Sequence, residues 1–528
     1  MHNNKFKIID NMALLHTVRN NIADEIVSSI EKSEIISRKN NKSEVLTYWG
    51  LNETSFLATH LNYNFIPSPL LRDYKFPGLY KPFEHQKITT SFLSLRKKAF
   101  CFNEAGTGKT SSVIWAADYL MNLGLIKKVL IICPLTIMYS AWQSDIFKTA
   151  MHRSAGVAYG TANKRKQIIN GEYDFIITNY EGVGILRNEI LNNDFDLIVV
   201  DEANAYKSTS TIRWKTLYKT IKPDNYLWLL TGTPASQSPI DAFGLARLVS
   251  PHRVPKYATA WRDRVMLQVS RFTWIPKTTS KADVFYALQP AIRYSKKECL
   301  DLPEVLYQIR ETPLTSQALK YYKELRDEML VETGGEQVSA VNAAAKLSKL
   351  LQVSGGAVYS DEKAVLQFDI KPRLNALMEV IDQTENKILI FVPFRHTIKI
   401  VSEYLSKEKV KSEIINGDVT ANNRSIIINK FQNEEQPKVL IIQPQSASHG
   451  VTLTAADTVI FWSPVMSVET YLQCIARIDR VGQKNNMTVV HLQGSEVERK
   501  MYKLLQNKVN LHTELVKLYQ SEIGENNG

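Results

Sequence analysis

Short apolar runs recur along the chain and alternate with amphipathic segments. The runs are rich in Val and Ile and do not alternate with polar residues, a pattern typical of strands buried on both faces in a parallel sheet. They lie at residues 99–102, 129–133, 197–200, 226–232, 387–392, 438–443 and 458–462. The intervening segments 111–124 and 397–408 carry apolar residues at helical spacing. This alternation of strand and helix predicts an α/β fold.

The predicted strands form two groups, one ending near Thr231 and the other starting near Lys387. The segment between them is far longer than an ordinary connection. Its clearest element is a helix at 339–351 that Gly355 and Gly356 would end. We therefore expect two parallel-sheet lobes with a helical insertion. The expected division is an N-terminal accessory region at 1–75, a first lobe at 76–252, a hinge with the insertion at 253–370, a second lobe at 371–505, and a C-terminal helix and tail at 506–528, with one long helix over 496–520.

Charge and cysteine usage narrow the class of protein. The 528 residues include 65 Lys and Arg against 53 Asp and Glu, a net charge of +12, which weakly indicates a polyanionic partner. The four cysteines lie far apart without a CxxC pair, which argues against a zinc site and against a disulfide framework. We see no signal peptide, and no apolar run nears the ~18 residues that span a membrane. We expect a cytoplasmic protein without membrane contact.

The first polar cluster reads 103-NEAGTGKT-110 and follows the run at 99–102. It is similar to the phosphate-binding loop GxxxxGK[ST], with Asn103 in place of the first glycine. Two glycines would turn backbone N–H groups toward phosphates, the lysine would reach the β- and γ-phosphates, and the threonine would place a hydroxyl on Mg²⁺. The alternative is a glycine-rich turn before a helix. The residues expected to bind ATP here are Glu104, Ala105, Gly106, Thr107, Gly108, Lys109 and Thr110.

A pair of carboxylates, Asp201 and Glu202, follows the run at 197–200. Burying adjacent carboxylates is costly, so a task is expected for them. Asp201, with Thr110, would bind the Mg²⁺ ion and its waters, and Glu202 would orient the attacking water. A lone Asp-Glu pair is often only a solvated strand end, but this pair follows a phosphate-binding loop.

The segment 473-QCIARIDRVGQ-483 carries a third cluster. On a helix, Gln473, Arg477 and Arg480 would share one face, and two guanidinium groups facing one way suit a triphosphate. Arginines supplied by the second lobe would stabilise charge on the transferring phosphoryl group. The alternative is a solvated basic helix face.

Together these motifs resemble the Swi/Snf-like branch of superfamily-two helicase-type ATPases, in its compact bacterial and phage form. The family's QxxxRxxRxGQ motif matches 473–483 at every fixed position. Further matches in order are 82-PFEHQ-86, 133-CPLTIMYSAWQSDI-146, 176-IITNYE-181, 230-LTGTPASQSPIDAFGLARLVSP-251, 388-ILIFVPF-394, 416-NGDVTANNRSIIINKFQN-433 and 446-SASHGVTLTAADTVIFW-462. The resemblance implies two RecA-like lobes that close on ATP, with Gln86 reading adenine and Gln473 contacting the nucleotide.

Some positions depart from the family pattern. Asn204 stands where the family usually has a histidine that helps couple hydrolysis to nucleic acid, so coupling is in question. The other departures are Gln237 for Asn, Ser448 and His449 for glycines, and 462-WSP-464 for the usual Trp-Asn-Pro. Family positions also imply nucleic-acid contacts, although each of these residues could instead be ordinary core or capping. They are Ser140, Trp142, Thr178, Tyr180, Ser446 and Thr452.

The expected function is that of a DNA-dependent ATPase that moves along double-stranded DNA as a monomeric motor and remodels DNA or protein–DNA complexes. ATP and Mg²⁺ would be its cofactors, and DNA with its bound proteins would be its partners. One alternative is a strand-separating DNA or RNA helicase, disfavoured because no wedge domain is evident. Another is a DNA-binding scaffold with a decayed ATPase, which only Asn204 favours.

Overall fold

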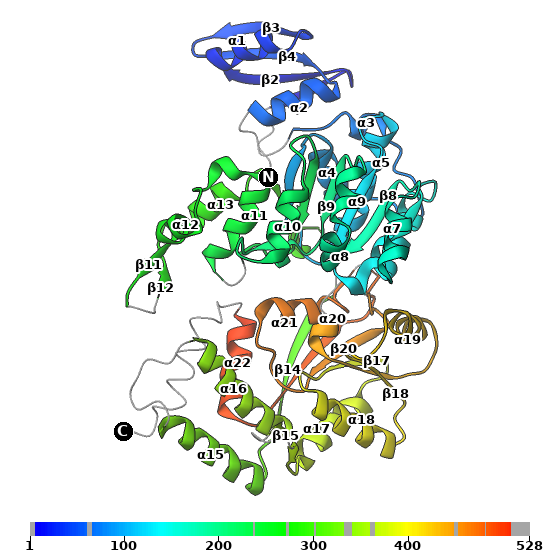
Figure 1. Cartoon of the computed structure of the whole chain (residues 1–528), viewed down its shortest axis with the longest axis vertical. Coiled ribbons are helices and arrows are strands. Elements are labelled where there is room, and N and C mark those ends of the chain that lie inside the picture. The colour runs from blue at the N-terminus through cyan, green and yellow to red at the C-terminus, as the bar shows by residue number, and fades with distance from the viewer. Residues whose placement is uncertain are drawn as a thin grey trace.

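The computed structural model describes residues 6–60, 66–235, 238–270, 274–299, 303–331, 340–359, 365–447, 452–480 and 482–507. A small antiparallel domain, a first α/β lobe and a second α/β lobe follow one another along the long axis of the molecule (Figure 1). Within the described residues, none of the helices has the length and apolar character needed to cross a membrane.

The N-terminal domain is an antiparallel sheet of strand order β1-β2-β4-β3 with a helix after β2 and another after β4. In β2, the side chains of Leu14, His16 and Val18 are buried while their neighbours are more exposed, which is the period-two pattern of a sheet covered on one face. Its elements are β1 Phe6–Ile9, β2 Ala13–Arg19, α1 Asn20–Ser29, β3 Ser33–Lys39, β4 Lys42–Tyr48 and α2 Leu51–His60.

The first lobe is built on a parallel sheet of order β13-β5-β10-β9-β6-β8-β7. Alternate residues of its central strands enter two separate apolar clusters, one on each face, so these strands carry no polar side. The strands are β5 Lys98–Cys101, β6 Val129–Cys133, β7 Ala155–Val157, β8 Phe175–Asn179, β9 Leu197–Val200, β10 Tyr226–Leu230 and β13 Ala291–Ile292. The helices are α3 Leu70–Asp73, α4 Glu84–Ser94, α5 Lys109–Asn122, α6 Ser144–Thr149, α7 Ala162–Ile169, α8 Tyr180–Ile185, α9 Arg187–Asn192, α10 Ile212–Thr220 and α11 Ala242–Val249.

The second lobe has a parallel sheet of order β14-β21-β20-β17-β19-β18, again between two apolar clusters. Its strands are β14 Val305–Glu311, β17 Lys387–Phe391, β18 Ser412–Ile415, β19 Val439–Ile442, β20 Ala456–Phe461 and β21 Met487–Gln493. Its helices are α17 Lys371–Gln383, α18 Arg395–Lys407, α19 Ala421–Asn433, α20 Pro444–Ala447, α21 Val468–Ile475 and α22 Glu496–Gln506. The two parallel sheets confirm the expected α/β class with two RecA-like lobes.

The segment expected to form the hinge and insertion contributes to both lobes. Its strand β13 extends the first sheet and its strand β14 extends the second. Helices α15 Ser316–Val331 and α16 Ala340–Gly355 lie on the second lobe, where Leu347, Leu350 and Leu351 of α16 join the core. The other elements are α12 Ala258–Val265, β11 Met266–Gln268, β12 Trp274–Pro276, α13 Ser280–Ala287, α14 Lys296–Cys299, β15 Ala357–Tyr359 and β16 Val365–Gln367.

Helix α22 is the described portion of the long helix expected over 496–520, whose remainder from residue 508 lies outside the described residues. Ser495 and Glu498 form a capping box at its start. Glu498 also accepts hydrogen bonds from both terminal nitrogens of Arg373, at 2.9 and 2.7 Å, and both side chains are buried. This ion pair ties α22 to α17 inside the second lobe.

Candidate functional site

The loop after β5 has the conformation expected of a phosphate cradle. Gly106 and Gly108 adopt φ values of 88° and 77°, which only glycine reaches without strain, and α5 begins at Lys109. The Lys109 Nζ atom donates to the carbonyl of Asn103 at 2.8 Å, so the amine lies within the loop. The Thr107 hydroxyl donates to the carbonyl of Glu104 at 2.8 Å, which closes the turn. A glycine-rich turn of this kind before a helix, with an amine inside it, is suited to bind phosphates.

Asn103, which replaces the first glycine of the motif, has its own structural task. Its buried side chain donates to the Thr89 hydroxyl at 2.8 Å and accepts from the backbone N–H of Tyr294 at 3.0 Å. The amide therefore joins α4, the phosphate loop and the segment that leads to the second lobe. At this position, a side chain that joins two segments by hydrogen bonds takes the place of the glycine.

Gln86 lies in the first turn of α4, against the phosphate loop. Its Oε1 atom accepts from the N–H of Phe83 at 2.8 Å, and a β-carbon on Gly108 would lie 2.0 Å from its Nε2 atom. His85 beside it forms a 2.8 Å hydrogen bond with the carbonyl of Thr107, a contact that the sequence motifs did not single out. The side chain at 86 is placed next to the nucleotide loop, and its reading of adenine stays a prediction.

Asp201 and Glu202 follow β9 and are enclosed by protein. The Trp142 indole donates to Asp201 Oδ2 at 2.9 Å, and Glu202 takes a left-handed backbone with φ 46°. Burial raises the pKa of both carboxyls, and burial together with the neighbouring Asp201 carboxylate raises that of Glu202 to about 7. A carboxyl with a pKa near neutrality is suited to exchange a proton with water.

Two of the residues expected to contact nucleic acid, Trp142 and Tyr180, donate hydrogen bonds to this acidic pair, and a third, Thr178, is buried in the sheet. Trp142 is fully buried on Asp201, and Thr178 is fully buried in β8. The Tyr180 hydroxyl donates to the carbonyls of Asp201 and Glu202, at 2.9 and 3.2 Å. The hydrogen bonds of Trp142 and Tyr180 and the burial of Trp142 and Thr178 also fit the alternative of ordinary core residues, and a nucleic-acid contact by these residues stays a prediction.

The other expected nucleic-acid contacts are more open. Thr452 is exposed, and its hydroxyl accepts from a terminal nitrogen of Arg480 at 2.8 Å. Ser446 is half-buried, and its carbonyl accepts from Arg424 at 3.3 Å. The side chain of Ser140 lies outside the described portion of the chain, as do residues 237, 448 and 449.

The segment 473–483 is helical only to Ile475, where α21 ends, so the expectation of one continuous helix is corrected. The carbonyl of Arg477 accepts from the N–H of Leu453 at 2.9 Å rather than from a following helical turn, and Gly482 has φ 101°. The guanidinium of Arg477 is buried and donates to the carbonyl of Gln473 at 2.7 Å. The positions of Arg477 and Arg480 are therefore set by the turns that follow α21 and not by a shared helix face.

The two lobes meet at these residues. A β-carbon on Gly106 would lie 3.1 Å from Cγ of Arg480, so this arginine covers the phosphate loop. Burial lowers the pKa of Arg477 to about 9 and also lowers that of Arg480, while the Glu202 carboxylate raises both. The structure therefore brings all five residues expected to act in catalysis to one cleft: Lys109, Asp201, Glu202, Arg477 and Arg480.

Asn204 bridges the lobes beside this cleft. Its side-chain nitrogen donates to the carbonyl and hydroxyl of Thr233, at 2.9 and 3.1 Å, and to Oε1 of Glu469 in the second lobe, at 3.0 Å. Gln473 donates to the same Glu469 oxygen at 3.4 Å. A short amide here keeps a donor that reaches across the cleft, although it cannot carry a charge as histidine can.

The residues expected to hold Mg²⁺ are of a suitable type. Thr110 lies in the first turn of α5 and Asp201 follows the last residue of β9, so a hydroxyl and a carboxylate both lie at the carboxyl edge of the first sheet. Oxygen ligands of this kind, few in number and completed by phosphates and water, are what Mg²⁺ prefers. Metal binding stays a prediction.

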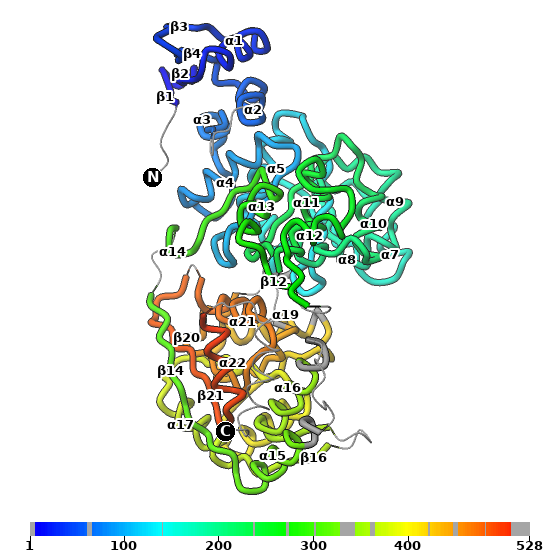
Figure 2. Tube along the Cα trace, turned by 90° about the vertical axis from the view of Figure 1, so that its left-hand side faces the viewer, coloured from blue at the N-terminus to red at the C-terminus, as the bar shows by residue number. Residues whose placement is uncertain are grey.

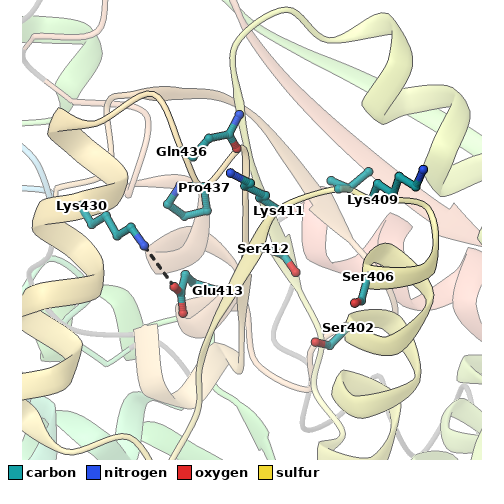
Figure 3. A pocket seen from close by; sticks show the side chains of 10 residues that line it. Ser402, Ser406, Lys409, Lys411, Ser412, Glu413, Lys430, Gln436 and Pro437 are labelled. Carbon is teal, nitrogen blue, oxygen red and sulfur yellow. Dashed lines mark ion pairs between the residues drawn. The ribbon is translucent and has the colours of Figure 1, made fainter.

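A hollow in the second lobe lies away from the cleft. It opens at the amino ends of β18 and β19, where Lys430 pairs with Glu413 at 3.7 Å (Figure 3). A second groove lies at the amino ends of β5, β9 and β10, between α2 and the first lobe. Ligands of open parallel sheets bind at the carboxyl ends of strands, so neither hollow is the nucleotide site.

Family profiles cover most of the chain. The SNF2-related domain matches residues 85–373 and the helicase conserved C-terminal domain matches residues 372–482. Their junction falls in the segment that passes from the first lobe to the second.

Relatives share about a quarter of their residues with this chain. Protein p41 of Acyrthosiphon pisum secondary endosymbiont phage 1 is 25% identical, over 76% of this chain and 88% of its own length. An uncharacterized ATP-dependent helicase of Mycoplasma genitalium is 25% identical over 74% of this chain, but only 37% of the helicase is covered. The solved SWI2/SNF2 ATPase core of Sulfolobus solfataricus in complex with dsDNA is 22% identical, with 85% of this chain and 97% of that chain covered and a TM-score of 0.41.

Proposed function

The chain belongs to the SNF2-related family, and from that premise we propose that it is an ATP-driven motor that moves along double-stranded DNA. The observation that carries the proposal is the cleft in which Arg480 of the second lobe covers Gly106 of the phosphate loop. A site divided between two lobes opens and closes as its nucleotide changes, and that movement can be transmitted to a bound polymer.

The chemistry assigned to each residue follows from its position. The N–H groups of the loop and the amine of Lys109 bind the phosphates, with the positive end of α5 behind them. Mg²⁺, held by Thr110 and Asp201, neutralises phosphate charge when bound. Glu202 holds the attacking water and accepts its proton, for which a pKa of about 7 is suited.

The arginines complete the proposed site from the second lobe. Arg477 and Arg480 lie close enough to Glu202 for its carboxylate to raise the pKa of both guanidiniums. They stabilise the charge that develops on the transferring phosphoryl group. Hydrolysis followed by release of phosphate takes the γ-phosphate charge out of the site, so the contact between the lobes weakens and the cleft opens.

DNA is proposed as the polymer because the chain is basic and its family relatives act on DNA. The net charge is +12, and one relative is named as an ATP-dependent DNA helicase. A motor that steps over any sequence must hold phosphates rather than base edges. Thr452, which accepts from Arg480, and the half-buried Ser446 are the more open candidates for that contact.

Phosphate release with and without plasmid DNA tests the proposal. We expect turnover that rises several-fold with duplex DNA and is absent in the Lys109→Ala variant. A wild-type protein without ATP hydrolysis would overturn the motor and support a binding scaffold. Stimulation by RNA alone would remove DNA from the proposal.

A strand-separating helicase is the second candidate, and a hairpin gives it specific support. Strands β11 and β12 pair antiparallel and project from the body of the first lobe (Figure 1). The hairpin exposes Leu267, Val269 and Ile275. The sequence offered no wedge, and this hairpin is an element of the kind that could hold the strands of a duplex apart. A forked duplex distinguishes the candidates.

A further inference from the structure

Lys296 is a buried cation at the point where the chain crosses between the lobes. It starts α14 at the edge of the first lobe, next to the start of β14 in the second (Figure 2). Its Nζ atom donates to Oδ2 of Asp479 at 2.6 Å and to the carbonyl of Asp479 at 2.8 Å. The two side chains are only 14% and 19% exposed. Lys296 thus holds both the side chain and the backbone of the residue before Arg480.

The backbone around Lys296 is fixed to the phosphate loop. The N–H of Lys296 donates to the Glu104 carboxylate at 3.1 Å, and the N–H of Glu104 donates to the carbonyl of Tyr294 at 2.9 Å. The side chain of Asn103 accepts from the N–H of Tyr294. These bonds prolong the pairing of β13 with β5, so the segment 294–296 moves with the first lobe.

These contacts form a closed circuit around the proposed phosphate site. Glu104 of the phosphate loop accepts from the N–H of Lys296, and the Lys296 ammonium donates to Asp479. Asp479 precedes Arg480, whose side chain returns to Gly106 of the same loop. A β-carbon on Gly106 would also lie 3.3 Å from the Asp479 carbonyl and 3.4 Å from Cε of Lys296. Few positions of Arg480 are compatible with all of these contacts.

We propose that Lys296 is a positioning residue that sets Arg480 over the phosphate loop by holding Asp479 across the cleft. The inference rests on the proposed ATPase function and adds to it a residue that none of the sequence motifs contains. A displacement of about 1 Å of a catalytic group can cost about 100-fold in rate, so loss of this hold should act on turnover.

The burial of the pair explains why it can act in this way. Exposed ion pairs are screened and hold neither partner firmly, whereas a buried pair keeps one geometry. Burial lowers the pKa of Lys296 and the Asp479 carboxylate raises it in part, so the ammonium form depends on its partner. The Lys296 ammonium also has two acceptors on Asp479, which fix the orientation of Asp479 as well as its distance from the ammonium.

The test compares Lys296→Ala, Lys296→Arg and Asp479→Asn with a matched control. Lys222→Ala removes an exposed ion pair with Asp194, at 3.2 Å, on the far side of the first lobe. We expect Lys296→Ala and Asp479→Asn to lower kcat roughly 10- to 100-fold with little change in KM, Lys296→Arg to restore some of the loss, and Lys222→Ala to match the wild type. Equal kcat for Lys296→Ala and Lys222→Ala would overturn the proposal.

A double-mutant cycle separates positioning from simple damage. In an Arg480→Ala background, Lys296→Ala should cause almost no further loss, because the group it positions is gone. Full additivity of the two losses would show that Lys296 acts independently of Arg480, and a fall in Tm that parallels the loss of kcat would show a structural role. Either result overturns the proposal.

Lobe closure gives a readout that does not require hydrolysis. Fluorescent labels at Ile212 in the first lobe and Ile426 in the second occupy exposed positions and report the distance between the lobes. We expect Lys296→Ala and Asp479→Asn to reduce the closed population while Lys222→Ala leaves it unchanged. An unchanged population in all variants overturns the proposal, whereas a wild type that closes but never hydrolyses ATP overturns only the proposed function.

Discussion

At the scale of single residues, two amides replace residues that the family pattern would lead one to expect. Asn103 cross-links α4 to the segment at Tyr294, and Asn204 links Thr233 to Glu469 across the cleft. Both keep hydrogen-bond donors inside protein, where an unmade hydrogen bond would be costly. Both departures therefore change connections within the site without leaving a gap in it, which argues against a decayed ATPase.

The second-lobe arginines should act on the chemical step. Arg477→Ala and Arg480→Ala are expected to lower turnover roughly 10³- to 10⁵-fold while nucleotide binding is largely retained. The physical reason is that their charge is needed most when the phosphoryl group transfers. Steady-state hydrolysis together with binding of a fluorescent nucleotide measures both effects. A variant that loses only DNA binding would show that its arginine has another role.

Turnover should depend on the ionisation of Glu202. Its carboxylate form accepts a proton from water, and burial with the nearby Asp201 charge raises its pKa to about 7. The raised pKa leaves a fraction of the protein in the inactive, protonated form below neutrality, so kcat should rise with pH through about 7. Single-turnover hydrolysis across this range checks the rise, with nucleotide binding as the control. A flat profile would contradict the assignment of Glu202 as the base.

At the scale of elements, the sequence predicted several buried strands from their apolar runs, but it missed the buried strands β8 and β21 as well as the more exposed ones. Strands β6, β9 and β17 coincide with their apolar runs because both faces of each strand enter the core. Strand β14 exposes Leu306, Tyr307 and Ile309 at the edge of its sheet, and the N-terminal strands cover only one face with core. The criterion of a continuous apolar run does not detect strands of these two kinds, and it also misses β8 and β21, where Thr, Asn, His or Gln interrupt the apolar residues.

The candidate site was predicted where a motif fixes it and missed where distant segments meet. Lys109, Asp201 and Glu202 follow strands directly, so their place at one sheet edge can be deduced from the sequence. The burial of Trp142 under Asp201 and the reach of Lys296 to Asp479 depend on packing between segments far apart in the chain. Local patterns carry no information about such contacts.

Breaking the ion pair between Arg373 and Glu498 should destabilise the second lobe. Arg373→Met leaves the Glu498 carboxylate buried without its partner, which is expected to cost about 3–5 kcal/mol of unfolding free energy. Urea unfolding followed by tryptophan fluorescence measures it. Arg373→Met combined with Glu498→Leu should be less destabilised than the single variant. A single variant as stable as the wild type would show that the pair contributes little.

At the scale of the whole molecule, the proposed function depends on how the two lobes would hold DNA together. The cleft residues come from both lobes, and the interlobe contacts of Asn204 and Lys296 lie beside the arginines. Closure therefore changes the relative position of any phosphate contacts on the two lobes. A motor of this kind moves by alternating its grip, and the duplex itself can stay intact.

Movement without strand separation is the outcome that we expect, and the hairpin makes the test sharper. Opening a duplex costs about 1.4 kcal/mol per base-pair step in stacking, so unwinding needs a pin that holds the strands apart. Strands β11 and β12 contain three residues each, a short stem for such a pin.

We expect ATP-dependent displacement of the third strand from a triplex and little opening of a forked duplex. Leu267→Asp, which alters the exposed stem, should leave triplex displacement unchanged. Efficient fork opening that Leu267→Asp abolishes, without triplex displacement, would identify the hairpin as a pin and the protein as a helicase.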